Sequence, residues 1–161
     1  MTDSSVQIRP YDERDRPGAI ALADRLAIGV APWRDQAAVE SAVTGWVERS
    51  LDESTAAGHA VYLAVVAEEV VGLISVGTRE HFTGEVDAYV GELVVAESME
   101  RRGIGARLMQ AAELWAAEHG FMRLTLETGA ANAGARAFYA SLGYGEEDVR
   151  LTKIKSREPT S

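Results

Sequence analysis

Residues 92–109 combine features that suit the binding of a phosphate group. An apolar stretch typical of a strand passes into a short loop with two arginines and two spaced glycines, and a helical pattern begins immediately. The first N–H groups of a helix lack partners within the helix and carry roughly half a positive charge. Glycines let the main chain approach a phosphate closely enough for these groups to bind it. The residues expected at this pyrophosphate site are Arg101, Arg102, Gly103, Ile104, Gly105 and Ala106.

The same glycines would also suit an ordinary surface loop that turns tightly, and the pattern alone does not separate these alternatives. It is not a P-loop, because no Gly-Lys-Ser/Thr is present. It is not a dinucleotide fingerprint either, because Leu108 stands where the third glycine would be.

Strand and helix patterns alternate along the rest of the chain and must position this loop. Strands are predicted at residues 6–9, 60–67, 70–78, 87–95, 121–127 and 144–153, with a hairpin turn at Glu68-Glu69. Helices are predicted at residues 16–28, 35–51, 104–119 and 132–142, with Asp35 as an N-cap. This order predicts an α/β (α+β) domain, with a mixed sheet covered by helices on both faces.

Composition and charge limit the classes of function. The chain has 161 residues and no cysteine, which fits one domain over residues 1–161 and excludes disulfides, thiolate metal sites and a cysteine nucleophile. Its core is expected over residues 5–153, with residues 1–4 and the polar tail 155–161 loosely ordered. A net charge of −9 disfavours nucleic acid and anionic membranes as partners. Since no apolar run approaches the ~20 residues of a membrane helix and the start lacks a secretion signal, a cytoplasmic protein is expected.

Two motifs resemble those of the GNAT family of acetyl-CoA-dependent N-acyltransferases. The family's central signature is a strand followed by Q/R-x-x-G-x-G/A at a helix start, and here it reads Glu100-Arg-Arg-Gly103-Ile-Gly105. Glu100 departs from the usual Gln or Arg. The stretch from Asn132 to Tyr144 matches the family's N-x-x-A-x-x-x-Y-x-x-x-G-F/Y helix at every specified position. The resemblance implies a GNAT fold of about six to seven strands and four helices, splayed between strands 87–95 and 121–127.

The resemblance also implies where acetyl-CoA binds. The pantetheine arm would lie in the splayed gap and pair with the main chain of Leu93, Val94 and Val95. Asn132 and Tyr139 match family positions that contact the coenzyme. Tyr139 is expected to protonate the departing thiolate, although its hydroxyl could instead bind the coenzyme or the backbone. Direct attack without a covalent acyl-enzyme is the family's usual route.

A catalytic base is needed because an alkylammonium, with a pKa of about 10, must lose a proton before its nitrogen can attack. Glu92, just before the coenzyme-pairing stretch, is the first candidate, acting directly or through water. Glu127, at the end of the neighbouring strand, is the second, because some protein-acetylating relatives use an acid there. Either one could instead be a solvated carboxylate at a strand end.

The sequence indicates fewer features for the site that binds the acceptor amine. Trp33, His81 and Asp87 occupy places where relatives bind the acceptor. The acidic residues around His81 suggest a cationic acceptor such as a polyamine, an aminoglycoside or a basic peptide terminus, unless the hairpin is simply solvated. His59, His81 and His119 show no metal-ligand spacing, so no metal is expected.

The sequence therefore predicts transfer of an acetyl group from acetyl-CoA to a primary amine of a cationic small molecule. The alternatives are a protein N-terminal or lysine acetyltransferase, and an acyl-CoA-binding sensor without turnover. The resemblance also implies a possible homodimer through the sheet edge or the C-terminal strand.

Overall fold

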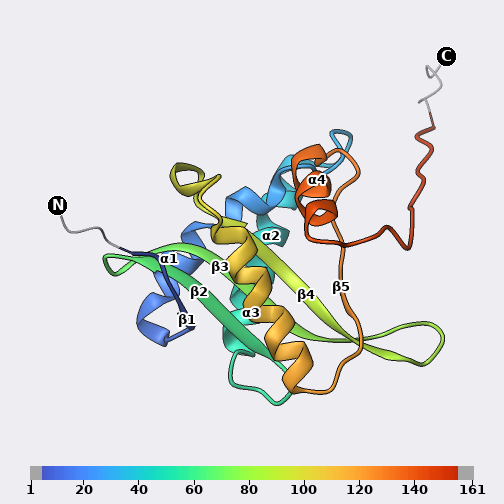
Figure 1. Cartoon of the computed structure of the whole chain (residues 1–161). Helices are drawn as coiled ribbons and strands as arrows, with labels where there is room; N and C mark the ends of the chain where they lie inside the picture. Colours follow the sequence, from blue (N-terminus) through green and yellow to red (C-terminus); the bar gives the residue numbers. More distant parts are fainter. Residues whose placement is uncertain (1–4, 156–161) are drawn as a thin grey trace.

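The computed structural model describes residues 5–155, and a single sheet organises them (Figure 1). The expectations for residues 1–4 and for the tail after residue 155 lie outside the described residues. Five strands lie side by side in chain order: β1 (Gln7–Pro10), β2 (Ala60–Val66), β3 (Glu69–Glu80), β4 (Val86–Val95) and β5 (Leu124–Leu126). The first four are antiparallel and β5 runs parallel to β4, so the predicted mixed sheet is confirmed.

Helices cover both faces of the sheet. Residues 5–155 contain α1 (Arg16–Ala21), α2 (Gln36–Asp52), α3 (Ile104–Glu118) and α4 (Ala133–Ser141), with short 3₁₀ turns η1 (Glu13–Asp15), η2 (Ala23–Ala27) and η3 (Glu97–Met99). In Figure 1, α3 crosses the front of the sheet and α2 lies behind it. Because side chains of a strand alternate between faces, Leu73 packs with α1, η2 and α2 while Ile74 packs with α3.

Capping and turn predictions agree with the structure. Asp35 caps α2 by accepting a hydrogen bond from the N–H of Ala38 at 2.8 Å, which satisfies one of the free donors at the helix start. The β2–β3 hairpin turns through Ala67 and Glu68, which both have positive φ angles of 47° and 67°. The predicted turn is thus present, one residue earlier than expected.

Three element predictions need correction. The helix expected over residues 16–28 is α1 followed by η2, because apolar positions 20, 22, 26 and 28 do not keep a spacing of three or four, and the tighter turn buries Leu22 and Ala23. The strand expected over residues 121–127 is only β5. Residues 144–153 form no strand: Val149 and Leu151 are 75% and 89% exposed. Alternating apolar and polar residues favour a strand but supply no partner for it, so the sheet has five strands instead of six or seven.

A β-bulge in β4 lies where this strand loses its pairing with β5. The β3–β4 register shifts between Ile74 and Val76, so that Gly91 and Glu92 together face Ser75. A Cβ atom on residue 91 would lie 2.7 Å from the Ser75 Oγ, which explains why glycine is required there. Since β5 pairs only with residues 88–90, residues 91–95 have no strand on that edge. This is the predicted splay.

Candidate active site

The open edge of β4 presents main-chain groups of alternate residues. The N–H of Ala96 donates to the Val71 carbonyl of β3 at 2.8 Å. Because hydrogen-bonding groups alternate along an antiparallel strand, the main chain of Val94 also faces β3, while that of Leu93 and Val95 faces the open edge. The Val95 carbonyl there already accepts a hydrogen bond from the Nε of Arg25 at 2.7 Å.

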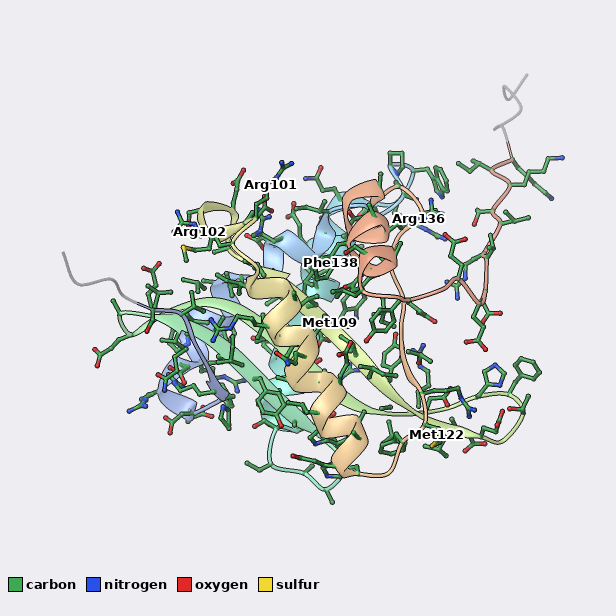
Figure 2. The ribbon with its side chains drawn as sticks, in the orientation of Figure 1. Arg101, Arg102, Met109, Met122, Arg136 and Phe138 are labelled. Carbon is green, nitrogen blue, oxygen red and sulfur yellow. The ribbon has the colours of Figure 1, made fainter. Side chains whose placement is uncertain are left out.

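The loop after β4 presents free N–H groups to the solvent. Arg101 and Gly103 have φ angles of 59° and 75°, and Gly103 occupies the N-cap position of α3 with no side chain to cap the helix. The first hydrogen bond of the helix is donated by the N–H of Arg107 to the Gly103 carbonyl. The N–H groups of residues 104–106 therefore lack acceptors within α3. Figure 2 shows the side chains of Arg101 and Arg102 beside this helix start, and both are exposed.

Arg107 does not add to this site. Its Nη1 donates to the Val6 carbonyl at 2.9 Å and so joins α3 to the N-terminal segment. The positive charge next to the helix start comes from Arg101 and Arg102.

Helix α4 approaches α3 closely at Gly105. A Cβ atom on residue 105 would lie 3.2 Å from the ring of Phe138, which Figure 2 shows on α4 beside α3. The next residue, Tyr139, is half-buried, and its ring meets that of Tyr144 edge-on at 6.1 Å. Burial raises the pKa of Tyr139 to about 12. Its hydroxyl therefore stays protonated at neutral pH and can donate a proton.

Asn132 positions α4. Its Oδ1 accepts from the N–H of Ala135 at 3.1 Å, and its Nδ2 donates to the Ile28 carbonyl at 3.3 Å. The two loops meet through glycines, because a Cβ on Gly29 would overlap Asn132 and a Cβ on Gly129 would overlap the Gly29 carbonyl. The Asn132 amide thus serves as a helix cap and as a tie between loops.

This glycine contact gives a testable consequence. Gly129→Ala is expected to destabilise the protein by about 1–3 kcal/mol, because two backbones must move apart. Gly134→Ala, in the first turn of α4, is the matched control: the nearest atom to its Cβ lies 4.0 Å away, and alanine favours the helix by about 1 kcal/mol. Urea unfolding of both variants measures the difference. Equal stabilities would show that the two loops do not pack as described.

Glu92 is buried on the α2 face of the sheet, with 8% of its surface exposed. Its Oε2 accepts hydrogen bonds from the Oγ of Ser50 on α2, at 2.6 Å, and from the Oγ of Ser75 on β3. The N–H of Glu92 donates to the same Ser75 Oγ at 3.0 Å. Burial raises the pKa of Glu92 above its ordinary value of 4.5, and the two serine hydroxyls partly offset this by stabilising the carboxylate.

A small cleft of about 150 Å³ adjoins this carboxylate. It lies on the α2 face, between the end of α2 and strands β2, β3 and β4. Ser50 and Ser75 line the cleft, together with Glu53, Tyr89 and Gly91. Glu92 itself does not line the cleft, but Ser50 and Ser75, which bind its carboxylate, both do.

The second carboxylate, Glu127, is exposed and forms an ion pair with Arg79, whose Nη1 lies 2.8 Å from Oε1. The Arg79 guanidinium also lies over the Tyr89 ring, 3.9 Å from its centre. Tyr89 lines the cleft, so this ion pair adjoins the same region from the β5 side.

The three expected acceptor contacts do not gather in one place. Trp33, 52% exposed, lies in the segment next to α4, whereas the β3–β4 hairpin projects from the opposite end of the sheet (Figure 1). His81, at the hairpin tip, shares a hydrogen bond with the Thr83 Oγ1 through its Nδ1 at 2.8 Å. Asp87 is buried and bonded to the Nε of Arg123 at 2.6 Å.

Sequence reasoning missed Ser50, Ser75 and Arg25. Ser75 had a usable signal, since it is the one polar side chain in the apolar run from Val70 to Gly77. Ser50 and Arg25 had none, because their contacts to β4 span 42 and 70 residues.

Two further searches cover the described part of the chain. Among residues 5–155, no group of three or more His, Asp or Glu side chains is arranged to hold a metal ion. No helix in that range has the length and apolar character needed to cross a membrane.

Comparison with known proteins identifies the family. The model of the acetyltransferase (GNAT) family matches residues 26–144, which is more than half of the chain. The chain therefore belongs to the GNAT acetyltransferase family. No curated protein matches it in sequence.

Solved structures share the fold at low identity. Aminoglycoside 6'-N-acetyltransferase AAC(6')-Ig from Acinetobacter haemolyticus is 18% identical, with a TM-score of 0.70 over 94% of this chain and 99% of that one. AAC(6')-Iy, solved with a CoA-containing bisubstrate analogue, is 19% identical, with a TM-score of 0.70 over 96% and 99%. A transcriptional regulator from Bacillus halodurans is 22% identical, with a TM-score of 0.71 over 94% and 100%.

Proposed function

We propose that this acetyltransferase moves an acetyl group from acetyl-CoA to a primary amine of a cationic small molecule. The observation that carries the proposal is the continuity of two features along one segment. The unpaired edge of β4 at residues 91–95 leads within a few residues to the free N–H groups at the start of α3. The first could pair with an amide-rich chain and the second could bind an anion, and coenzyme A carries both an amide-containing pantetheine arm and a pyrophosphate.

The residues present fit this co-substrate. The main chain of Leu93 and Val95 can pair with the amides of a pantetheine arm, as an added strand would. Val94 contributes its side chain to the core instead, because its main chain faces β3. Residues 101–106 would hold the pyrophosphate through N–H groups and the two exposed arginines. When bound, acetyl-CoA supplies an activated acyl group, and an N–H on the open edge polarises its carbonyl.

Glu92 is the proposed base. Burial gives it a raised pKa, and so a greater affinity for a proton, close to a cleft that can take a small amine. Its carboxylate would accept the amine proton through the hydroxyl of Ser75 or Ser50: the hydroxyl accepts a proton from the amine and passes its own to Glu92. Glu127 is the second candidate for the base: its carboxylate is exposed, and it pairs with Arg79.

Tyr139 is the proposed acid. Its hydroxyl is protonated at all ordinary pH values because burial holds its pKa at about 12. A pKa of about 12 makes the phenol a weaker acid, but the same burial would also raise the pKa of the coenzyme thiol beside it and so partly offset this. Asn132 supports this role indirectly by capping the helix that carries Tyr139.

The cationic acceptor is supported by charge. The chain carries a net charge of −9, and Glu53 borders the cleft. His81 and Asp87 stay in the proposal as outer contacts at the hairpin end for an acceptor longer than the cleft, with Asp87 acting while paired with Arg123, and Trp33 stays as a separate contact beside α4. Several proteins of similar fold are aminoglycoside acetyltransferases, which act on polycationic amines.

Calorimetric titration of the purified protein tests the coenzyme. Acetyl-CoA is expected to bind in the micromolar range, more tightly than CoA, and ATP is expected to bind weakly because it lacks the pantetheine arm. Equal affinities for all three would refute the pantetheine site.

A panel of amines then tests the reaction by following free thiol. Thiol release with polyamines or aminoglycosides supports the small-molecule acceptor. Release only with peptides would favour a protein acetyltransferase, and binding without any release would favour a sensor.

A further inference from the structure

Arg25 connects the helical layer to the coenzyme segment. It lies in η2, and its guanidinium reaches across to the end of β4, where Nε donates to the Val95 carbonyl at 2.7 Å. Its Nη2 donates to the carboxylate of Glu100, and its Nη1 lies 3.9 Å from Glu97. The Arg25 side chain is only 24% exposed, so these contacts are partly shielded from water.

The negative charge of Glu100 would disfavour anion binding, and its contact with Arg25 can offset that charge. It precedes Arg101 and the start of α3, where the phosphates would bind. A free carboxylate there would repel an anionic ligand, and it would also offer Arg101 or Arg102 a competing partner. The Arg25 guanidinium neutralises the Glu100 carboxylate by pairing with it.

We propose that Arg25 is a positioning residue for the coenzyme: it cancels the charge of Glu100 and fixes the end of β4, so that the phosphate loop can accept an anion. This inference rests on the proposed acetyl-CoA function and goes beyond the motif, since Arg25 lies outside the residues that the family model matches. An arginine that is distant in sequence thereby offsets the negative charge of an acidic residue in an anion-binding loop.

A double-mutant cycle separates the charge effect from a loss of structure. R25Q is expected to weaken acetyl-CoA binding about tenfold or more, because it leaves the Glu100 carboxylate uncompensated. E100Q is expected to bind as well as the wild type or better. The double variant R25Q/E100Q should recover to within about threefold of the wild type, because the Glu100 charge is gone and the more distant Glu97 is solvent-exposed.

Three controls make the cycle specific. S-acetylpantetheine, which lacks phosphates, should lose much less affinity than acetyl-CoA in R25Q. R25K keeps the positive charge but not the fork that also holds the Val95 carbonyl, so it should bind acetyl-CoA more tightly than R25Q, provided that melting temperatures show both variants folded. R14Q removes an exposed arginine that pairs only loosely with Asp12, at 3.6 Å, and should change nothing.

The outcomes distinguish the two proposals. An R25Q variant that binds acetyl-CoA like the wild type would overturn the role of Arg25. A double variant as weak as R25Q would overturn its charge-cancelling role and leave only its contact with the Val95 carbonyl. A folded wild-type protein with no affinity for acetyl-CoA would overturn the proposed function itself.

Discussion

Replacing Tyr139 with phenylalanine is expected to lower kcat about 100-fold or more while leaving the affinity for acetyl-CoA within about twofold. The substitution keeps the ring that packs against Phe138 and Tyr144 and removes only the hydroxyl. Because the pKa of Tyr139 is about 12, the wild-type enzyme should also keep its rate up to about pH 10, without an alkaline loss from this group.

Tyr144→Phe is the matched control. Tyr144 lies beside Tyr139, but its hydroxyl donates to Glu113 at 2.9 Å, and the family motif accepts phenylalanine at its position. Steady-state kinetics and calorimetry of both variants make the comparison. If Y139F turns over like the wild type, the proton comes from elsewhere and Tyr139 has a structural role. Weaker coenzyme binding with unchanged kcat would assign its hydroxyl to the coenzyme.

Glu92→Gln is expected to reduce kcat about 100-fold at neutral pH and to remove the acidic limb of the pH–rate profile. The base acts only when ionised, so the wild-type rate should fall as the pH drops through the Glu92 pKa. Burial raises that pKa above 4.5, so the fall should begin at a higher pH than an exposed glutamate would give. In E92Q there is no such group to titrate.

Stability should respond to the same group with a defined sign. The folded protein holds the Glu92 proton more tightly than the unfolded chain does. The contribution of Glu92 to the free energy of unfolding therefore decreases as the pH rises from below 4.5 through the raised pKa of the folded state. Urea unfolding of E92Q across this range should lack that decrease.

Two other variants test whether the effect of E92Q is specific to Glu92. Glu48→Gln removes an exposed carboxylate from the same helix that carries Ser50, and should leave the rate and its pH profile unchanged. Glu127→Gln tests the second candidate. An acidic limb that survives in E92Q and disappears in E127Q would move the role of base to Glu127.

Local patterns were sufficient wherever neighbours in sequence determine the structure. Asp35 and Asn132 were readable as the starts of helices because a cap bonds to an N–H three residues away. The strand–loop–helix around Gly103 was readable because an apolar stretch, two spaced glycines and a helical pattern follow one another directly along the chain. The same locality let two motifs indicate the family.

Sequence patterns predicted the wrong element where the expected packing or pairing partner was absent or different. Val149 and Leu151 alternate with polar residues as in a strand, yet the segment pairs with no strand and both side chains stay exposed. Residues 16–28 carry enough apolar residues for one helix, but burial of Leu22 against the sheet favours a 3₁₀ turn. In both cases the outcome depends on whether distant residues offer packing or pairing, which local propensity does not report.

The sequence by itself indicated the family and identified the loop at residues 101–106, Glu92 and Tyr139 as candidates. Only the tertiary structure decided their surroundings: Ser50 and Ser75 bind Glu92 from two other elements, and Arg25 reaches Glu100 across 75 residues. A side chain's pKa and charge balance depend on what burial brings next to it, and no spacing along the chain encodes that.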